Sequence, residues 1–413
     1  MDNKYRELLV KLTRDMVDIP TVNLPPNGDE AAGQEYIKNV LAGLGLEITE
    51  FSPEQSPDFQ NDGDFIKGQN YKGRKNVSGL WKGSGGGRSL ILNGHMDVVT
   101  EEPGPWTKCE PFKSVVEGDR IYGRGTADMK GGLACSLVAI KMLKDEGFKP
   151  GGDIYFESVV DEEYASSAGS ISARKLGGKA DFAIITEPSG LMVCPACVGS
   201  IVVKLTMQGV AGMPYTGEKV VNPVYMLGEI IGLIKEYDGQ RLARVKTPPL
   251  WKDTPQAAQI VITKAKSGDV RPHGQLTTPA DAWIELVIQT YPHEDMRAVY
   301  DDFVQFVKSR FSQPPKLDVE LEYHFCRAAD MRADAGEGVE MLAKCASQYA
   351  EQSKVCGAMF SCDLFAFTLY GDMPGAVFGP VGEKLHGPDE WVSIKSMEKA
   401  AMAIHDFIVK WSA

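Results

Sequence analysis

The chain has 413 residues and a formal net charge of -12, with 56 acidic against 44 basic side chains, and no dense basic stripe, which argues against non-specific nucleic-acid binding. Hydrophobic residues make up 43% and charged residues 24%, as in a globular protein large enough for two or three domains. Neither a signal peptide nor an apolar run of about 18 residues is visible, so we expect a cytoplasmic protein with no membrane partner.

The first half of the chain alternates between amphipathic helices and apolar strands. The spacing of apolar residues predicts helices at 4–18, 31–44, 129–146 and 167–176, and strands at 76–81, 89–93, 154–160 and 182–186. The polar, glycine-rich stretch at 52–75 is predicted to be a surface loop. Strands that alternate with helices in this way predict a parallel α/β sheet.

The pattern changes after about residue 198. Strands are predicted at 201–207, 259–263, 282–290 and 317–325, and helices at 222–236 and 293–312. Their order, β-α-β-β-α-β, is that of a ferredoxin-like sandwich. The first style resumes with segments at 336–352, 376–379 and 397–411. We therefore predict an α/β domain formed by residues 1–198 and 326–413, with a smaller domain inserted at 199–325.

The eight cysteines are expected to be reduced and mostly buried. Cys194 and Cys197 form a single C-x-x-C motif without a second pair. We interpret them as small apolar residues at a strand edge rather than as a redox or zinc motif.

Five side chains of the metal-binding kind occur where strands end or helices begin: His95, Asp128, Glu163, Glu187 and His386. Two imidazoles and three carboxylates are enough ligands for two divalent metals that share one carboxylate. Such a site is hydrolytic rather than structural, because structural zinc sites are usually closed and rich in cysteine.

His95 and Asp97 lie in the segment G-H-M-D, which follows an apolar strand. Residues two apart in an extended segment share a face. His95 is thus a candidate metal ligand, and Asp97 a candidate hydrogen-bond partner for its other ring nitrogen, which would fix the tautomer. A solvated turn is the alternative explanation of this pair.

Asp128 lies in the segment Y-G-R-G-T-A-D-M-K-G-G. The glycines allow a tight turn before the next helix and present Asp128 at that turn. A carboxylate placed there can bridge two cations. Considered alone, Asp128 could also be the N-cap of the helix that follows.

Asp161, Glu162 and Glu163 follow a buried strand. Adjacent carboxylates repel one another unless a cation compensates, so one can be a ligand while its neighbour accepts a proton. Glu187 ends another buried strand, where open α/β sheets usually bind ligands. His386 lies in a glycine-flanked turn. The alternatives are an exposed acidic turn, a solvated glutamate and a loop histidine.

Taken together and in this order across residues 90–390, the five motifs resemble the metallopeptidase family that includes acetylornithine deacetylase, succinyl-diaminopimelate desuccinylase, aminoacylase and carboxypeptidase G. The segment G-R-G-T-A-D-M-K-G-G is the most specific of them. The resemblance implies a zinc-peptidase-like catalytic domain with a mixed central sheet. It also implies an inserted ferredoxin-like lid and dimerisation domain, a homodimer through that domain, and one or two divalent metals, with zinc the default and manganese or cobalt suited to the same ligands.

The resemblance also implies a role for each ligand. Asp128 would bridge two metals. His95 and Glu187 would complete one metal site, and Glu163 and His386 would complete the other.

Glu162 would be the general base and Asp97 would orient His95. Metal-bound water would attack a carbonyl carbon, and Glu162 would take its proton and pass it to the leaving nitrogen. The predicted function is therefore a metal-dependent hydrolase of a C–N bond in a small-molecule substrate. An N-acyl amino acid deacylase or peptidase is the default form of that activity.

The inserted domain departs from the family pattern. Met213 stands where the family usually has a histidine that crosses a dimer interface to polarise the scissile carbonyl. Gln289 stands in place of an arginine that holds the substrate carboxylate, and glutamine cannot make a charged bidentate pair. Arg271 and His273, in V-R-P-H-G, are candidate substitute donors, with an exposed loop as the alternative.

These departures leave other functions open. One alternative is an aminohydrolase (deaminase) that acts on an activated aromatic amine or amide. Such a substrate depends less on the family's histidine and arginine, in whose places Met213 and Gln289 stand. A non-catalytic binding homologue is a further alternative, but a retired site has no physical need for clustered carboxylates. Phosphate hydrolysis is disfavoured because no Walker-type loop is present.

Overall fold

The computed structural model describes residues 1–59, 61–101, 104–164, 168–268, 276–312 and 316–413. These residues form two compact units. Unit 1 comprises Met1–Cys197, Ala329–Ala358 and Cys362–Ala413, and unit 2 comprises Val198–Ala328 and Met359–Ser361. No helix within the described ranges is both long enough and apolar enough to cross a membrane.

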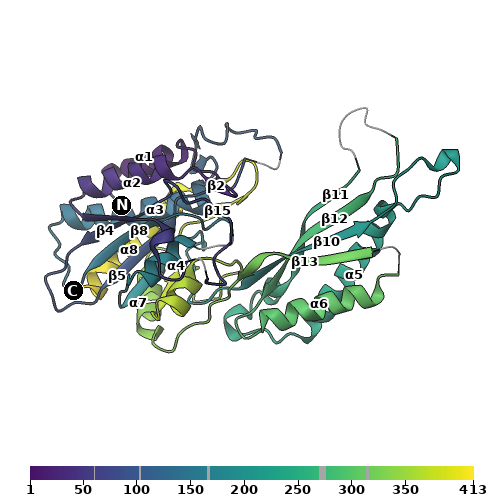
Figure 1. Ribbon diagram of the computed structural model, residues 1–413. Helices are drawn as coiled ribbons and strands as arrows, with labels where there is room; N and C mark the ends of the chain where they lie inside the picture. Colours follow the sequence, from purple (N-terminus) through teal and green to yellow (C-terminus); the bar gives the residue numbers. More distant parts are fainter. Residues whose placement is uncertain (60, 102–103, 165–167, 269–275, 313–315) are drawn as a thin grey trace. The chain divides into compact units, whose positions relative to one another are not determined.

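Unit 1 is built on a six-stranded mixed sheet in the order β14-β9-β5-β8-β4-β3, of which Figure 1 labels β4, β8 and β5. Its strands are β3 (Glu47–Phe51), β4 (Asn76–Trp81), β5 (Leu90–His95), β8 (Ile154–Val159), β9 (Phe182–Ile185) and β14 (Gly375–Val377). Strands β14, β9, β5 and β8 run parallel, whereas β4 is antiparallel to both of its neighbours. The α/β fold with the mixed central sheet that the resemblance implies is therefore confirmed. The parallel sheet predicted from the alternation of strands and helices is wrong at β4.

Alternation along β5 directs different residues to the two faces of this sheet. A Cβ at Gly94 would lie 2.8 Å from Leu133, so a bare glycine lets helix α3 (Gly131–Asp145) approach that face closely. Asn93 points to the other face and donates a hydrogen bond to Ser170 of helix α4 (Ala168–Lys175) at 3.2 Å.

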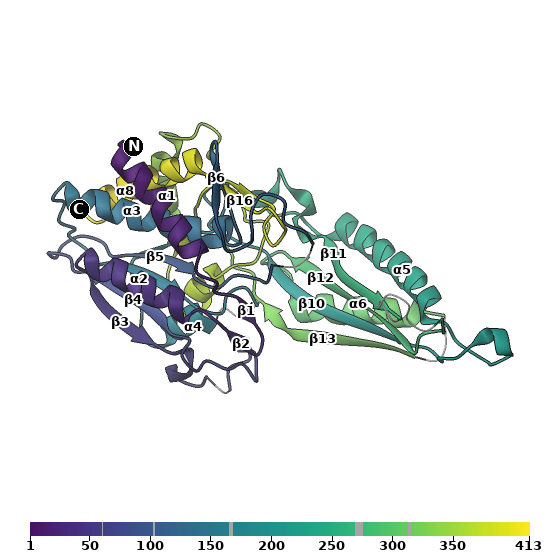
Figure 2. The ribbon, with the colours of Figure 1, turned by 90° about the horizontal axis from the view of Figure 1, so that it is seen from above.

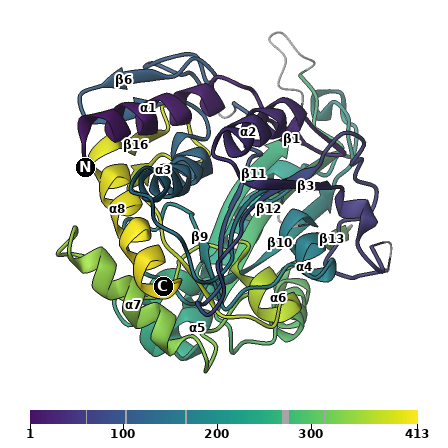
Figure 3. The same cartoon turned by 90° about the vertical axis from the view of Figure 1, so that its left-hand side faces the viewer.

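The remaining helices of unit 1 add to these layers. Helix α8 packs against α3, and α1 contacts both of them (Figures 2 and 3). Helix α2 packs on β3 and β4, and α7 packs on α8. Their bounds are α1 (Asn3–Val17), α2 (Ala31–Gly43), α7 (Gly336–Ser347) and α8 (Ile394–Trp411).

Some helix ends differ from the predicted ones because capping side chains fix them. Helix α8 begins at Ile394, three residues before the predicted segment 397–411, since Ser393 accepts a hydrogen bond from the N–H of Ser396. In unit 2, helix α6 (Met296–Arg310) begins three residues after the predicted start at 293, since Asp295 accepts hydrogen bonds from two N–H groups of the first turn.

A second sheet of unit 1 was not predicted. It is antiparallel, in the order β15-β16-β7-β6. Its central strands β7 and β16 are three residues long and pair with Trp391 opposite Tyr122. The strands are β6 (Val115–Glu117), β7 (Arg120–Tyr122), β15 (Gly382–Glu383) and β16 (Trp391–Ser393). A short β1–β2 hairpin (Asn23–Leu24 and Asn27–Gly28) follows α1.

Unit 2 is a four-stranded antiparallel sheet in the order β11-β12-β10-β13, with two helices on one face. Its elements are β10 (Gly199–Gln208), α5 (Pro223–Arg244), β11 (Ile260–Ser267), β12 (Asp281–Thr290), α6 (Met296–Arg310) and β13 (Lys316–Cys326). Buried aliphatic side chains alternate along β10 and β12 and pack against both helices. The predicted ferredoxin-like sandwich is confirmed.

Candidate metal centre

Three neighbouring parallel strands bring His95, the acidic turn and Glu187 to one edge of the sheet. His95 is the last residue of β5, Glu162 and Glu163 follow β8, and Glu187 follows β9. Because β5 pairs in parallel with both β8 and β9, the carboxyl ends of all three strands meet at the same edge. The sequence order of motifs thus becomes a spatial cluster.

The small sheet brings in the other two side chains. Asp128 follows β7 across a glycine turn in which Gly125 has a φ of +81°. His386 lies between β15 and β16, with a φ of +58°. Since β16 pairs with β7, the loop that carries His386 lies beside the turn that carries Asp128.

Asp128 lies between the two histidines. Its Oδ1 is 3.2 Å from Nε2 of His95, and its Oδ2 is 3.2 Å from Nε2 of His386. Oε1 of Glu187 is 3.6 Å from Nε2 of His95, and Oε2 of Glu163 is 2.8 Å from Nε2 of His386. The five side chains therefore form two three-residue groups that share Asp128: one with His95 and Glu187, the other with Glu163 and His386. In each group the candidate ligand atoms lie within 4.8 Å of one another.

The charges of this cluster fit a divalent cation. Burial raises the pKa of Glu162 and Glu187 well above the usual range, and the negative charge of nearby carboxylates raises both further. Burial also opposes ionisation of Asp128, but hydrogen bonds from His386 and His95 hold the pKa of Asp128 below its usual value. The cluster holds four carboxylates, those of Asp128, Glu162, Glu163 and Glu187. Carboxylates this close to one another need cations to remain ionised together. Nitrogen and oxygen donors arranged as two groups with one shared carboxylate suit two divalent ions.

Glu162 is close to the cluster but belongs to neither three-residue group. Its Oε2 is 3.8 Å from Nε2 of His95, and its side chain is 13% exposed. His386 is 52% exposed and His95 is fully buried. The group around His386 is therefore the one with access to solvent.

Asp97 contacts the His95 ring through its backbone carbonyl oxygen and not, as predicted, through its carboxylate. Nδ1 of His95 lies 2.9 Å from the backbone carbonyl oxygen of Asp97, whereas the nearest carboxylate oxygen is 3.7 Å away. A carbonyl oxygen only accepts, so Nδ1 carries the hydrogen and Nε2 faces Asp128. The Asp97 carboxylate instead accepts hydrogen bonds from the backbone N–H groups of Glu162 and Glu163, each at 3.0 Å.

Glu390 was missed in the sequence. Its Oε1 accepts hydrogen bonds from the N–H groups of Ala127 (2.9 Å) and Asp128 (3.1 Å). Its Oε2 accepts from Gly125 N–H (2.9 Å) and from Arg124 Nη1 (2.7 Å). The only sequence signal was its place in H-G-P-D-E, four residues after His386.

The candidate substrate-binding residues lie in unit 2 or outside the description. Met213 is 40% exposed, and its backbone N–H donates to Glu218 at 2.7 Å. Gln289 is half-buried in β12, and its amide donates to the carbonyl oxygen of Met359 at 2.8 Å. Arg271 and His273 lie outside the described residues.

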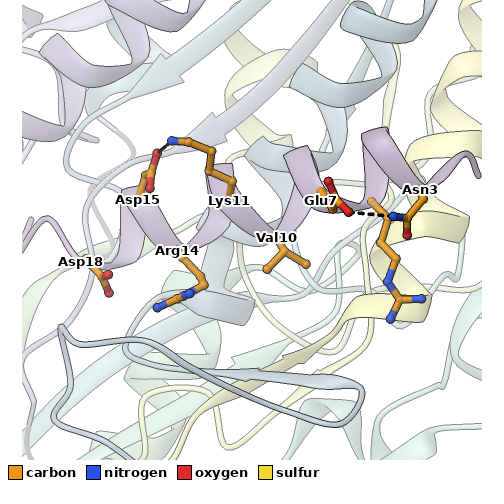
Figure 4. Close-up of a pocket in the computed structure, with 8 residues that line it drawn as sticks. Asn3, Glu7, Val10, Lys11, Arg14, Asp15 and Asp18 are labelled. Atoms are coloured by element: carbon orange, nitrogen blue, oxygen red, sulfur yellow. Dashed lines mark hydrogen bonds and ion pairs between the residues drawn. The ribbon is translucent and has the colours of Figure 1, made fainter.

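Two other features stand apart from the cluster. An open cavity of about 460 Å³ lies along α1, and its lining includes none of the five candidate metal ligands (Figure 4). All eight cysteines are unbridged, and Sγ of Cys194 lies 3.8 Å from Sγ of Cys356.

Comparison with known proteins places these observations in a family. The sequence pattern of "Peptidase family M20/M25/M40" matches residues 91–410. The N-formyl-4-amino-5-aminomethyl-2-methylpyrimidine deformylase of Bacillus subtilis (strain 168) is 31% identical over 192 residues, which are 46% of this chain and 41% of the deformylase. The succinyl-diaminopimelate desuccinylase of Methylobacterium radiotolerans is 31% identical over 235 residues, 54% of each chain.

The chain spans about half the length of these curated relatives. The solved structure of the Bacillus subtilis YXEP protein, described as a dinuclear metal binding peptidase from the M20 family, superimposes with a TM-score of 0.59 at 16% identity. The superposition covers 100% of this chain and 99% of that one, and it supports the fold.

Proposed function

This chain belongs to peptidase family M20/M25/M40, and on that premise we propose that it is a hydrolase that uses divalent metal ions to cleave a C–N amide bond in a small molecule. The observation that carries the proposal is the position of Asp128, whose two oxygens each face a different histidine at 3.2 Å. A carboxylate in that position is suited to bridging two ions.

We propose that His95, Asp128 and Glu187 hold one ion, and that Asp128, Glu163 and His386 hold the other. Zinc suits this set of nitrogen and oxygen donors, and manganese or cobalt suits it too. When bound, such ions supply Lewis-acid activation of a water molecule and of the scissile carbonyl.

Glu162 is the proposed general base. Its carboxylate lies beside His95 yet outside both ligand groups, so it is available to take a proton from the attacking water. The same carboxylate would then deliver that proton to the leaving nitrogen. Asp97 holds the backbone of Glu162 and Glu163 and, through its carbonyl, the tautomer of His95.

For the substrate we propose an N-acylated amine. The relatives carry names of a deformylase and a desuccinylase, both of which remove an acyl group from nitrogen. Because Gln289 donates its amide to the carbonyl of Met359, it does not supply the charged clamp of an arginine. This favours a substrate whose leaving amine lacks a carboxylate, such as a heteroaromatic amine, over a standard N-acyl amino acid. Release of ammonia from an aromatic amine is the second candidate, supported by the same two replacements, Met213 and Gln289.

A homodimer through unit 2 and a cytoplasmic location complete the proposal. Large apolar side chains are exposed in unit 2, among them Tyr215, Tyr225 and Leu276, and β11 is an edge strand of its sheet. Light scattering coupled to size-exclusion chromatography tests the dimer, and a monomer at micromolar concentration would refute it.

The function is tested by a product assay on metal-reconstituted protein. Carboxylate, free amine and ammonia are measured over formylated and succinylated heteroaromatic amines, N-acyl amino acids, dipeptides and aromatic amines. Carboxylate and amine in equal amounts support amide hydrolysis, and ammonia alone supports the second candidate. Absence of all three products across the panel, with metal bound, would refute the proposed hydrolase.

A further inference from the structure

The acidic turn after β8 begins with a residue in an unusual conformation. Asp161 is fully buried and has a φ of +63°, in the left-handed region that residues other than glycine rarely adopt. Such a conformation persists only where the surroundings enforce it. Asp161 directly precedes Glu162, so its backbone angles set the direction in which the Glu162 side chain leaves the turn.

Three side chains from earlier in the chain hold the Asp161 carboxylate. Asn23 Nδ2 donates to its Oδ1 at 2.8 Å, Arg74 Nη2 donates to the same oxygen at 3.2 Å, and the Tyr71 hydroxyl donates to Oδ2. All three donors precede residue 91, where the family match begins. They come from the β1–β2 hairpin and from the long loop before β4.

Arg74 also forms an ion pair with a second buried carboxylate, that of Glu30. Its guanidinium pairs with the fully buried Glu30, with Nε 2.8 Å from Oε2, and the Arg74 side chain is 2% exposed. One buried cation is therefore paired with two buried carboxylates, those of Glu30 and Asp161. Buried pairs contribute little net stability, because desolvation offsets their attraction, whereas their geometry is strongly constrained.

Asn23 connects this group to the backbone of the general base. Its amide nitrogen has two hydrogens, and it lies 2.8 Å from Oδ1 of Asp161 and 2.9 Å from Oδ2 of Asp97. Asp97 in turn accepts from the N–H groups of Glu162 and Glu163. A continuous chain of hydrogen bonds thus leads from Arg74 through Asp161, Asn23 and Asp97 to Glu162.

We propose that Arg74, Asn23 and Tyr71 are positioning residues for Glu162. They hold Asp161 in the left-handed conformation and thereby aim the Glu162 carboxylate at the metal centre. The inference rests on the proposed function, because it takes Glu162 as the general base. It adds residues to that function which contact neither substrate nor metal.

The test compares Arg74→Met and Arg74→Lys with a matched control, Arg241→Met. Arg241 is also buried and ion-paired, and its hydrogen-bond partners among the described residues, Ala258 and Glu294, belong to unit 2 and not to the acidic turn. Metal content, melting temperature, kcat and KM are measured for each. We expect Arg74→Met to lower kcat by about tenfold to a hundredfold with metal retained and KM little changed, since small misplacements of a reacting group cost rates of that order. Arg74→Lys should recover part of the loss, and Arg241→Met should lose stability but keep kcat.

Tyr71→Phe serves if Arg74→Met does not fold, since it removes one hydroxyl and almost no volume; we expect a smaller fall in kcat. A kcat for the Arg74 or Tyr71 variant equal to that of Arg241→Met would overturn the inference, as would loss of metal in proportion to activity. A crystal structure of the metal-loaded variant provides a readout independent of turnover. Asp161 should leave the left-handed region there, and an unchanged turn would overturn the inference even if the wild-type protein proved inactive on every substrate tested. Inactivity of the wild type would itself count only against the proposed function.

Discussion

Oε1 of Glu390 accepts a hydrogen bond from the backbone N–H of Asp128 at 3.1 Å. Glu390 lies four residues after His386 in the sequence. This hydrogen bond therefore ties the segment that carries His386 to the turn that carries Asp128. Buried Arg124 lies on the other oxygen of Glu390 and compensates its charge. Glu390 belongs to neither group of candidate ligands, and it holds the turn of Asp128, the proposed bridging ligand.

We predict that Glu390→Gln weakens metal binding or activity by about tenfold to a hundredfold, which is the usual cost of losing a group that orients a ligand. The amide keeps one accepting oxygen and replaces the other with a donor, so one pair of hydrogen bonds is lost. Competition with a chelating dye measures the affinity. Asp389→Asn is the control, because Asp389 accepts from Thr107 and Lys108 and not from the Asp128 turn. Equal affinities for both variants would contradict this role.

Removal of the metals should both abolish hydrolysis and destabilise unit 1. Without cations the clustered carboxylates repel one another, and a ligand at a hundred times its dissociation constant stabilises the folded state by about 2.7 kcal/mol. Thermal unfolding after chelation, and again after addition of zinc, manganese or cobalt, measures this effect. Identical melting temperatures with and without metal would show that the cluster does not bind ions.

Glu162→Gln and Glu163→Gln should fail in different ways, although the residues are adjacent. Glu162→Gln removes the proposed base, so turnover should fall by about a hundredfold to ten-thousandfold with metal content unchanged. Glu163→Gln removes a carboxylate 2.8 Å from His386 and should reduce metal content. Mass spectrometry of bound metal, together with initial rates, separates the two. Activity that survives Glu162→Gln would reject the assignment of the base.

Cys109 should react slowly with alkylating reagents. Burial raises the pKa of its thiol to about 11, and the negative charge of Asp389 adds to the shift. Below pH 11 the folded protein therefore carries the unreactive thiol, whereas an unfolded cysteine ionises near pH 8.5. Iodoacetamide labelling should accelerate as the pH rises toward 11 in the native protein, and should already be fast at pH 9 in urea. Equal labelling rates in the two states would contradict the shift.

The sequence was sufficient to predict that His95, the acidic turn and Glu187 lie together, because all three follow parallel strands. Apolar runs ending at His95, before the acidic turn and before Glu187 located three strand ends, and adjacent parallel strands necessarily bring their carboxyl ends together. The order of elements in unit 2 likewise predicted its sandwich. In both cases the periodicity of apolar residues carried the information.

Other parts depended on contacts that periodicity does not record. Strands β7 and β16 have three residues each, too few for a recognisable alternation, so their pairing was not predicted, and with it the role of Glu390. The use of the Asp97 carbonyl instead of its carboxylate depends on local rotation of the chain after β5. Asn23 and Arg74 reach Asp161 across more than 80 residues of sequence, which no local pattern reveals.

The ends of the inserted segment meet, since Cys197 and Ala329 exchange backbone hydrogen bonds at 2.9 and 3.1 Å. Most of unit 2 is thus one uninterrupted stretch, whereas unit 1 needs chain from both sides of it. During synthesis the ribosome releases the sandwich before β14 and His386, so the sandwich can acquire its fold while the central sheet still lacks an edge strand. Of the two proposed ligand groups, only the one that contains His386 needs chain from beyond the sandwich. We therefore expect the ion proposed for that group to be the later of the two to bind.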